Sequence, residues 1–202
     1  MKTSYWIGHT LFIAAAHAFF GFRVKDRDKL IEDGPVLMVA NHQSFLDPPF
    51  LGSIHHEAIY FLARKTLFRG IFKTIYNSWQ AIPIDQENPD MASLKKIIAL
   101  LKQGEKVLIF PEGSRTPDGE LLPAMPGVGL IISKARVPVQ PLRIFGAHEA
   151  MPIGCHFPRM RPVSATVGDP IPFTEEELKA KGKDAYQHLA DKAMDAVREL
   201  TS

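Results

Sequence analysis

Short apolar runs alternate with amphipathic stretches along most of the chain. Six runs rich in aliphatic and β-branched residues predict strands: Val36–Ala40, Ile59–Ala63, Ala81–Ile84, Val107–Phe110, Val139–Ile144 and Ser164–Val167. Apolar residues at helical spacing predict helices over Ser93–Gln103, Val128–Lys134 and Ala185–Leu200. Thr174 and Glu177 predict a capping box at the start of a further helix. Strands that alternate with helices predict a single α/β domain, in which helices flank a mainly parallel mixed sheet.

The first 22 residues form a separate apolar segment. No formal charge occurs from Thr3 to Phe22, and a helix of this length would measure about 30 Å, close to the thickness of a bilayer's hydrocarbon core. The segment is compatible with a cleaved signal peptide, a buried core helix or a membrane anchor, and we favour the anchor. We therefore divide the chain into a membrane-associating helix, residues 1–22, and a folded α/β domain, residues 23–202.

The charges around this segment predict its orientation. Lys2 precedes it, whereas Arg23, Lys25, Arg27 and Lys29 follow. Positive charge tends to stay on the cytoplasmic side. We expect the protein at the cytoplasmic face of the cell membrane, attached peripherally or by a single N-terminal anchor.

A basic and aromatic stretch follows the second predicted strand. Every charge from Ala58 to Ile84 is positive, and the aromatic residues Phe68, Phe72, Tyr76 and Trp79 recur at helical spacing. The stretch is compatible with a core helix that has a solvated basic face, or with a cationic amphipathic surface that contacts anionic lipid.

Composition excludes several classes of protein. The chain has 202 residues, of which 46% are hydrophobic, so a folded core is expected. A single cysteine excludes an internal disulfide, and a net charge of +2 gives no reason to expect nucleic acid as a partner. The histidines at 55, 56 and 148 lack the spacing of metal ligands, so no metal site is expected.

Two polar loops directly follow predicted strands, where ligands bind in parallel α/β sheets. In the first, Asn41 to Asp47, residues His42 and Asp47 could meet if Asp47 caps a helix that begins at Pro48. A carboxylate on one imidazole nitrogen leaves the other nitrogen as a general base. Asn41 and Ser44 are further candidates for substrate binding in this loop.

The second loop reads Pro-Glu-Gly-Ser-Arg-Thr and begins at Pro111. Gly113 permits close approach of the backbone, Ser114 and Thr116 carry hydroxyls, and the planar guanidinium of Arg115 suits phosphate. Backbone N–H groups in such a turn can bind an anion. The alternative is a solvated turn with an ion pair between Glu112 and Arg115.

Together the motifs NHQSFLD and FPEGSRT, with the weaker QAIPID and VPVQPL, resemble the glycerophospholipid acyltransferases, which include 1-acyl-sn-glycerol-3-phosphate acyltransferase. The resemblance covers about residues 22 to 170. It implies transfer of a fatty acyl group from acyl-CoA or acyl carrier protein, as co-substrate, to a hydroxyl of a lysophospholipid at a membrane surface. It implies no other cofactor.

The same resemblance assigns roles to individual residues. His42 would be the base and Asp47 its partner, in direct attack of the acceptor hydroxyl on the thioester. Glu112, Gly113 and Arg115 would bind the phosphate end of the acceptor, most directly 1-acyl-sn-glycerol 3-phosphate. Pro138 would lie near the acyl site.

Two departures from the family pattern concern the acceptor. Gln86 follows Asp85 where a basic residue is usual, and Ala124, Met125 and Pro126 precede Gly127 where a Lys or Arg is common. The acceptor is then a less anionic lysolipid or an amino-lipid, or another cation replaces the missing charge. Candidates for that cation are Arg64, Lys65 and Arg143.

Three other functions are compatible with parts of the pattern. Ser114, His42 and Asp47 could form a hydrolase triad, although the G-x-S-x-G elbow is missing. Cys155 could form an acyl-enzyme. A non-catalytic module could hold acyl chains at a membrane, but it would not need the His42–Asp47 pair.

Overall fold

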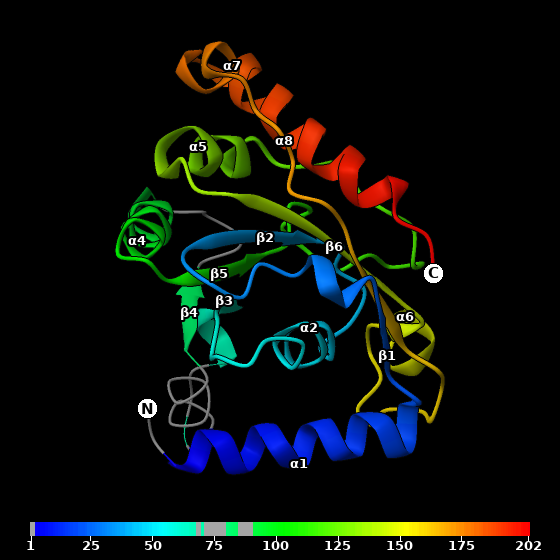
Figure 1. Cartoon of the computed structure of the whole chain (residues 1–202). Coiled ribbons are helices and arrows are strands. Elements are labelled where there is room, and N and C mark those ends of the chain that lie inside the picture. Colours follow the sequence, from blue (N-terminus) through cyan, green and yellow to red (C-terminus); the bar gives the residue numbers. More distant parts are fainter. Residues whose placement is uncertain (1–2, 68–69, 71–79, 85–90) are drawn as a thin grey trace.

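A seven-stranded sheet forms the centre of the described part of the chain (Figure 1). The computed structural model describes residues 3–67, 70, 80–84 and 91–202. The strands lie in the order β1-β7-β6-β2-β5-β3-β4, and all neighbours are parallel except β6 and β7. Their bounds are β1 Arg23–Lys25, β2 Val36–Ala40, β3 Tyr60–Arg64, β4 Ala81–Ile84, β5 Lys106–Ile109, β6 Val139–Phe145 and β7 Ser164–Val167. The predicted mainly parallel mixed sheet is confirmed.

The six predicted strands are all present, and three have the predicted bounds. β1 escapes prediction because it is a short edge strand. Arg23 and Lys25 are exposed and only Val24 is partly buried, so the segment has no apolar run. It joins the sheet through parallel pairing with β7.

Helices cover both faces of the sheet (Figure 1). Their bounds are α1 Thr3–Phe20, α2 Asp47–Gly52, α4 Met91–Lys102, α5 Pro126–Ala135, α6 Ala147–Ala150, α7 Glu175–Lys179 and α8 Lys183–Glu199. Two 3-10 turns occupy Arg27–Lys29 and Lys65–Leu67. The predicted capping box is confirmed, since Thr174 and Glu177 bond reciprocally at the start of α7.

The core lies on both sides of the sheet because every residue of β2 is buried. Alternate residues of a strand face opposite sides. Val36 and Met38 therefore pack in the cluster on the α1 and α2 side, whereas Leu37 and Val39 pack in the cluster with α4, α5 and α8. An unbroken apolar strand is typical of a parallel sheet covered on both faces.

α1 runs across the outside of α2 (Figure 1). Phe12 and Phe20 each pack edge-on against Phe50 of α2, with ring centroids 5.3 and 5.4 Å away. Leu11 and Phe19 remain exposed. None of the helices that the structure describes is long and apolar enough to cross a bilayer.

Two expectations fall outside the described residues. The aromatic helix predicted around Phe68 to Trp79 cannot be compared with the fold. The same holds for Asp85 and Gln86, at the end of the second motif.

Candidate active site

The two polar loops meet at one edge of the sheet because β2 and β5 are parallel neighbours. Residues 41–46 leave the carboxyl end of β2, and residues 110–125 leave the carboxyl end of β5. The backbone of His42 is bonded on both sides to the second loop: its N–H donates to Glu112 Oε1 at 2.7 Å, and its carbonyl accepts from Thr116 N–H at 2.9 Å. The second loop thus sets the position of the histidine.

His42 and Asp47 form a hydrogen-bonded pair. Asp47 Oδ2 lies 2.8 Å from His42 Nδ1, the Asp47 side chain is fully buried, and the imidazole is 15% exposed. The imidazole also stacks on Phe110, with centroids 4.0 Å apart and an interplanar angle of 16°. Because Nδ1 is engaged, Nε2 is the nitrogen available to a substrate proton.

The expectation that Asp47 caps α2 is wrong. Asp47 is the first residue of the helix, and its Oδ2 accepts from the N–H groups of Gln43 and Ser44 at 2.6 and 2.7 Å. The physical reason is that Pro49 has no N–H to donate to a cap, and that the N–H of Phe50 donates to the carbonyl of Leu46 at 3.0 Å. The carboxylate therefore folds the loop back on itself, which brings His42 within reach.

Glu112 is bonded to backbone rather than to Arg115. Its Oε1 accepts from His42 N–H, its Oε2 accepts from Leu122 N–H at 2.9 Å, and its side chain is buried. Burial raises the pKa of Glu112 to about 7, against the two hydrogen bonds. Glu112 therefore links the backbone of the histidine loop, at His42, to the later part of its own loop, at Leu122.

Arg115 presents a guanidinium over the ring of Phe45, with Cζ 3.7 Å from the ring centroid. Its Nη1 is buried without a hydrogen-bond partner in the described part of the chain. Desolvation lowers the pKa of Arg115, and the charge of Arg64 lowers it further. An anion bound here would satisfy the unpaired donor and relieve the repulsion between the two cations.

The glycine and hydroxyls of the second loop have different surroundings. Gly113 has a φ of +71°, and a Cβ there would collide with the sulfur of Met125. Ser114 is exposed to solvent. Thr116 is buried and donates its hydroxyl to Asp118 at 2.8 Å. Gly113 and Ser114 thus remain open to a ligand, whereas Thr116 shapes the loop.

Asn41 bonds to the backbone of β6, and Ser44 bonds to the backbone after α6. Asn41 Nδ2 donates to the carbonyl of Ile144 at 2.9 Å, and its Oδ1 accepts from Ile144 N–H at 2.8 Å. Ser44 donates its hydroxyl to the carbonyl of Met151 at 2.9 Å. Both side chains are buried, so their contacts anchor the histidine loop to β6 and to the segment after α6.

The structure does not bring Pro138 to this edge. Pro138 precedes β6 and its carbonyl accepts from Leu37 N–H at the start of β2. In parallel strands the start and the end lie at opposite edges of the sheet. Pro138 therefore lies at the edge of the sheet opposite His42, and the motif VPVQPL runs from there along β6 towards the edge that carries the histidine. The expected role of Pro138 near the acyl site stays a prediction.

The three alternative cations are placed differently. Arg143 donates to the carbonyls of Arg198 and Leu200 at 2.6 and 2.8 Å, so it holds the end of α8. Arg64 ends β3 and Lys65 follows it, at the same edge as the histidine. Of the three, Arg64 is electrostatically coupled to Arg115.

An apolar cavity of about 190 Å³ opens beside His42. Its walls come from β3, β4, β5, α4 and α5, with Leu62, Ile109 and Ile131 among the lining residues. Sequence reasoning did not identify Leu62, Ile109 and Ile131 as site residues, because apolar residues in such patterns are also typical of an ordinary core. It missed Phe110 and Phe45 for the same reason. The available signal for Phe110 was its position at the end of a predicted strand, directly before the second loop.

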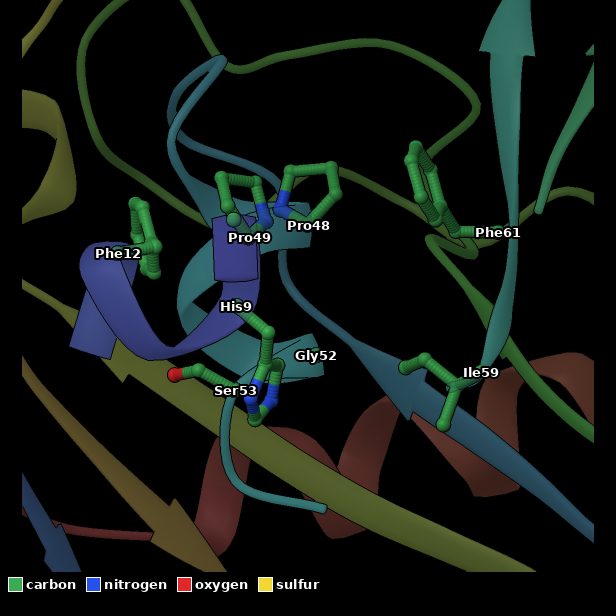
Figure 2. A pocket seen from close by; sticks show the side chains of 9 residues that line it. His9, Phe12, Pro48, Pro49, Gly52, Ser53, Ile59 and Phe61 are labelled. Carbon is green, nitrogen blue, oxygen red and sulfur yellow. The ribbon is translucent and has the colours of Figure 1, made fainter. Parts of the chain in front are cut away.

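A second cavity lies on the opposite face of the sheet, between α1 and α2 (Figure 2). His9 and Phe12 of α1 contribute to it, and Pro48 and Pro49 of α2 line it immediately after Asp47. Phe61 lines this cavity whereas Leu62 lines the first, because successive side chains of β3 point to opposite faces.

Comparisons with known proteins identify the family. A family model described as Acyltransferase matches residues 21–145. The chain is 36% identical over 129 residues to the chloroplastic 1-acyl-sn-glycerol-3-phosphate acyltransferase BAT2 of Brassica napus, covering 60% of this chain and 36% of that protein. It is 29% identical over 153 residues to the 1-acyl-sn-glycerol-3-phosphate acyltransferase of Bacillus subtilis, covering 75% of this chain and 74% of that protein.

A solved structure shares the fold. The crystal structure of the 1-acyl-sn-glycerophosphate (LPA) acyltransferase PlsC from Thermotoga maritima aligns with a TM-score of 0.72 and 24% identity, over 96% of this chain and 79% of that chain. The family model matches more than half of the residues and, with the similar sequences, identifies the family. The chain belongs to the Acyltransferase family, among the glycerophospholipid acyltransferases.

Proposed function

We propose that this protein transfers a fatty acyl group from acyl-CoA or acyl carrier protein to a hydroxyl of 1-acyl-sn-glycerol 3-phosphate. The observation that carries the proposal is the His42–Asp47 pair at the edge of the sheet, with the guanidinium of Arg115 in the neighbouring loop. The relatives from Brassica napus and Bacillus subtilis are 1-acyl-sn-glycerol-3-phosphate acyltransferases, which supports this acceptor.

In the proposed reaction, His42 Nε2 takes the proton of the acceptor hydroxyl as its oxygen attacks the thioester carbonyl. A carbon–oxygen bond forms, the carbon–sulfur bond breaks, and the thiolate leaves with little need for acid assistance. Asp47 keeps the proton on Nδ1 and stabilises the imidazolium that forms. The imidazolium then returns its proton to the thiolate or to solvent.

Recognition of the acceptor is assigned to Arg115, with Arg64 nearby. The buried, unpaired Nη1 of Arg115 supports this assignment, and Gly113 and Ser114 leave backbone and hydroxyl donors beside it. Arg64 is the better replacement for the basic residue missing at position 86, because Arg143 is committed to α8. The alternative acceptor is a less anionic lysolipid or an amino-lipid.

The acyl chain is assigned to the apolar cavity beside His42, since a fatty chain requires an apolar wall next to the reacting carbonyl. The acceptor itself resides in a membrane. We place the protein peripherally at the cytoplasmic face of the cell membrane, with the uncharged exposed side of α1 towards lipid.

The test is a matrix of donors and acceptors with purified protein, read by mass spectrometry of the lipid products. Acyl-CoA and acyl carrier protein are each offered with lysophosphatidate, a zwitterionic lysolipid and a neutral lysolipid. A preference for lysophosphatidate supports the acceptor assignment, and a preference for another acceptor overturns it. His42→Ala should lower turnover about 10²- to 10⁴-fold without loss of lipid binding. An unchanged rate would refute the role of the histidine.

The same assay separates the rival mechanisms. Ser114→Ala should leave a transferase active and a Ser114-dependent hydrolase inactive. A Cys155 relay predicts an acyl-enzyme that hydroxylamine cleaves. Thiol release from acyl-CoA only when a lysolipid is present would exclude a non-catalytic module.

A further inference from the structure

An exposed apolar and basic loop lies next to the active-site edge. It covers residues 151–162, between α6 and β7, and we call it the 151–162 loop. Phe157 is 83% exposed, Met160 73% and Ile153 48%. Arg159 and Arg161 are exposed in the same loop, which contains no Asp or Glu. Large apolar side chains exposed to water beside two arginines indicate a surface that binds a partner.

The loop is held firmly at its base. Arg159 N–H donates to the carbonyl of Ala150 at 2.7 Å, which closes the loop behind residues 151–158. Val163 N–H donates to the carbonyl of Phe20 at the end of α1. The exposed side chains are therefore displayed from a closed turn, and the chain that leaves the loop is bonded to the end of α1 (Figure 1).

The loop is also connected to the catalytic segment. Ser44, two residues after His42, donates its hydroxyl to the carbonyl of Met151. β6 is parallel to β2, so the segment that leaves β6 emerges at the same edge of the sheet as His42. A surface that contacts this loop would therefore face the catalytic edge.

We propose that the 151–162 loop is a membrane-docking element, which inserts Phe157 and Met160 between lipids while Arg159 and Arg161 contact anionic headgroups. The proposal rests on the proposed function, because an acceptor embedded in a bilayer must reach His42 from that edge. Apolar tips flanked by arginines match an anionic bilayer, whose interior accepts the side chains and whose surface attracts the charges.

A lipid surface fits better than an acidic carrier protein. An acidic carrier protein could bind through the arginines alone. That partner would leave the exposure of Phe157 and Met160 unexplained. Glu149 lines the same surface hollow as Arg159 and Arg161, so the charge excess is modest and the apolar side chains must contribute.

The single cysteine of the chain permits a direct measurement. Cys155 lies inside the loop, so a polarity-sensitive fluorophore attached there reports the environment of the loop without background. The probe surface is vesicles of phosphatidylcholine with about one quarter phosphatidylglycerol. We expect emission to shift to shorter wavelength with these vesicles and the shift to shrink at high salt. An unshifted spectrum while the protein is bound to vesicles would overturn the proposal.

Variants separate the two parts of the loop. Phe157→Ser/Met160→Ser and Arg159→Gln/Arg161→Gln should each weaken sedimentation with these vesicles about tenfold or more. Met91→Ser and Lys95→Gln/Lys96→Gln are matched controls on α4, which packs on the face of the sheet opposite α1, and should bind as the wild type does. Melting curves check that each variant is folded.

Activity distinguishes this proposal from the proposed function. The loop variants should acylate detergent-dispersed acceptor at the wild-type rate and lose activity with vesicle-embedded acceptor. Wild-type protein that acylates neither form contradicts the proposed function, whereas the vesicle measurements still test docking. The docking role would be overturned if Phe157→Ser/Met160→Ser bound vesicles as well as the wild type does. It would also be overturned if Arg159→Gln/Arg161→Gln bound vesicles normally and lost only the use of acyl carrier protein as donor.

Discussion

At the scale of single residues, one carboxylate oxygen organises the histidine loop. Asp47 Oδ2 accepts from His42 Nδ1 and from the N–H groups of Gln43 and Ser44. Three donors on one buried oxygen favour a charged acceptor, because bonds to a carboxylate are stronger than bonds to a neutral amide. In an amide, the N–H₂ group would replace Oδ1, which is buried without a hydrogen-bond partner in the described part of the chain. The Asp47 side chain therefore has two roles: it holds the loop in place and it stabilises charge on the imidazole.

We expect Asp47→Asn to lower kcat about 10²- to 10⁴-fold, because the imidazole loses both its tautomer and the charge that stabilises its protonated form. Initial rates with the preferred donor and acceptor measure the effect. Asp118→Asn is the matched control: it removes a carboxylate from the second loop, where Asp118 is exposed and bonds Thr116. Equal rates for Asp47→Asn and the wild type would contradict the assigned role.

Glu112 and Arg115 are three residues apart but should affect different kinetic constants. Glu112 holds the backbone of His42, so Glu112→Gln should lower kcat, by up to about 10²-fold, with little change in the KM of the acceptor. Arg115→Gln should raise that KM about tenfold or more, because it removes a charged donor. Steady-state kinetics with varied acceptor separate the two. A KM effect alone for Glu112→Gln would indicate that Glu112 binds the acceptor.

At the scale of elements, α5 and α8 cross closely at Gly129. A Cβ at Gly129 would collide with the backbone carbonyl of Tyr186 in α8, which no side-chain rotation can relieve. The crossing matters for the site because α5 forms a wall of the cavity beside His42.

Gly129→Ala should therefore lower the free energy of unfolding by about 1–3 kcal/mol or more. Gly127→Ala is the control in the same helix, since its Cβ would make only an ordinary contact, 3.7 Å from Leu94. That variant should be neutral or gain up to about 1 kcal/mol from helix propensity. Urea unfolding measures both, and equal stabilities would contradict the packing account.

At the scale of the whole molecule, a buried histidine makes the fold sensitive to acid. His55 is 1% exposed and its Nε2 lies 2.8 Å from Met38 Sδ. Burial above all, together with the charges of Lys106 and Arg27, lowers the pKa of His55 to about 4, while Glu57 opposes this shift. The unfolded chain therefore binds more protons than the folded one between about pH 6.5 and pH 4.

Stability contributed by neutral His55 is present above about pH 6.5 and is lost as the pH falls towards 4, by roughly 3 kcal/mol at most. Glu112 acts in the opposite sense. Its pKa is raised to about 7, so its protonation favours the fold as the pH falls. We expect His55→Gln to flatten the acid side of the stability curve, as measured by urea unfolding at several pH values. Parallel curves for variant and wild type would exclude His55 as the cause.

The sequence by itself determined six strands and the pairing of His42 with Asp47. Strand periodicity is local, and two residues in one short loop need no distant partner to meet. The bonds of Glu112 to His42 and of Asn41 to Ile144 were decided by the tertiary structure. These partners lie 70 and 103 positions apart, and only the order of β6, β2 and β5 in the sheet brings them together.

Tertiary structure also decided which motif residues stay open to a ligand. Ser44 and Thr116 have hydroxyls that suit a substrate, yet their buried hydroxyls bond protein atoms. The motif predicted Pro138 near the acyl site, but the direction of β6 places this residue at the edge of the sheet opposite His42. Residue type indicates what a side chain is able to bind. What it does bind depends on which buried donors and acceptors the fold leaves beside it, because these must be satisfied before a ligand arrives.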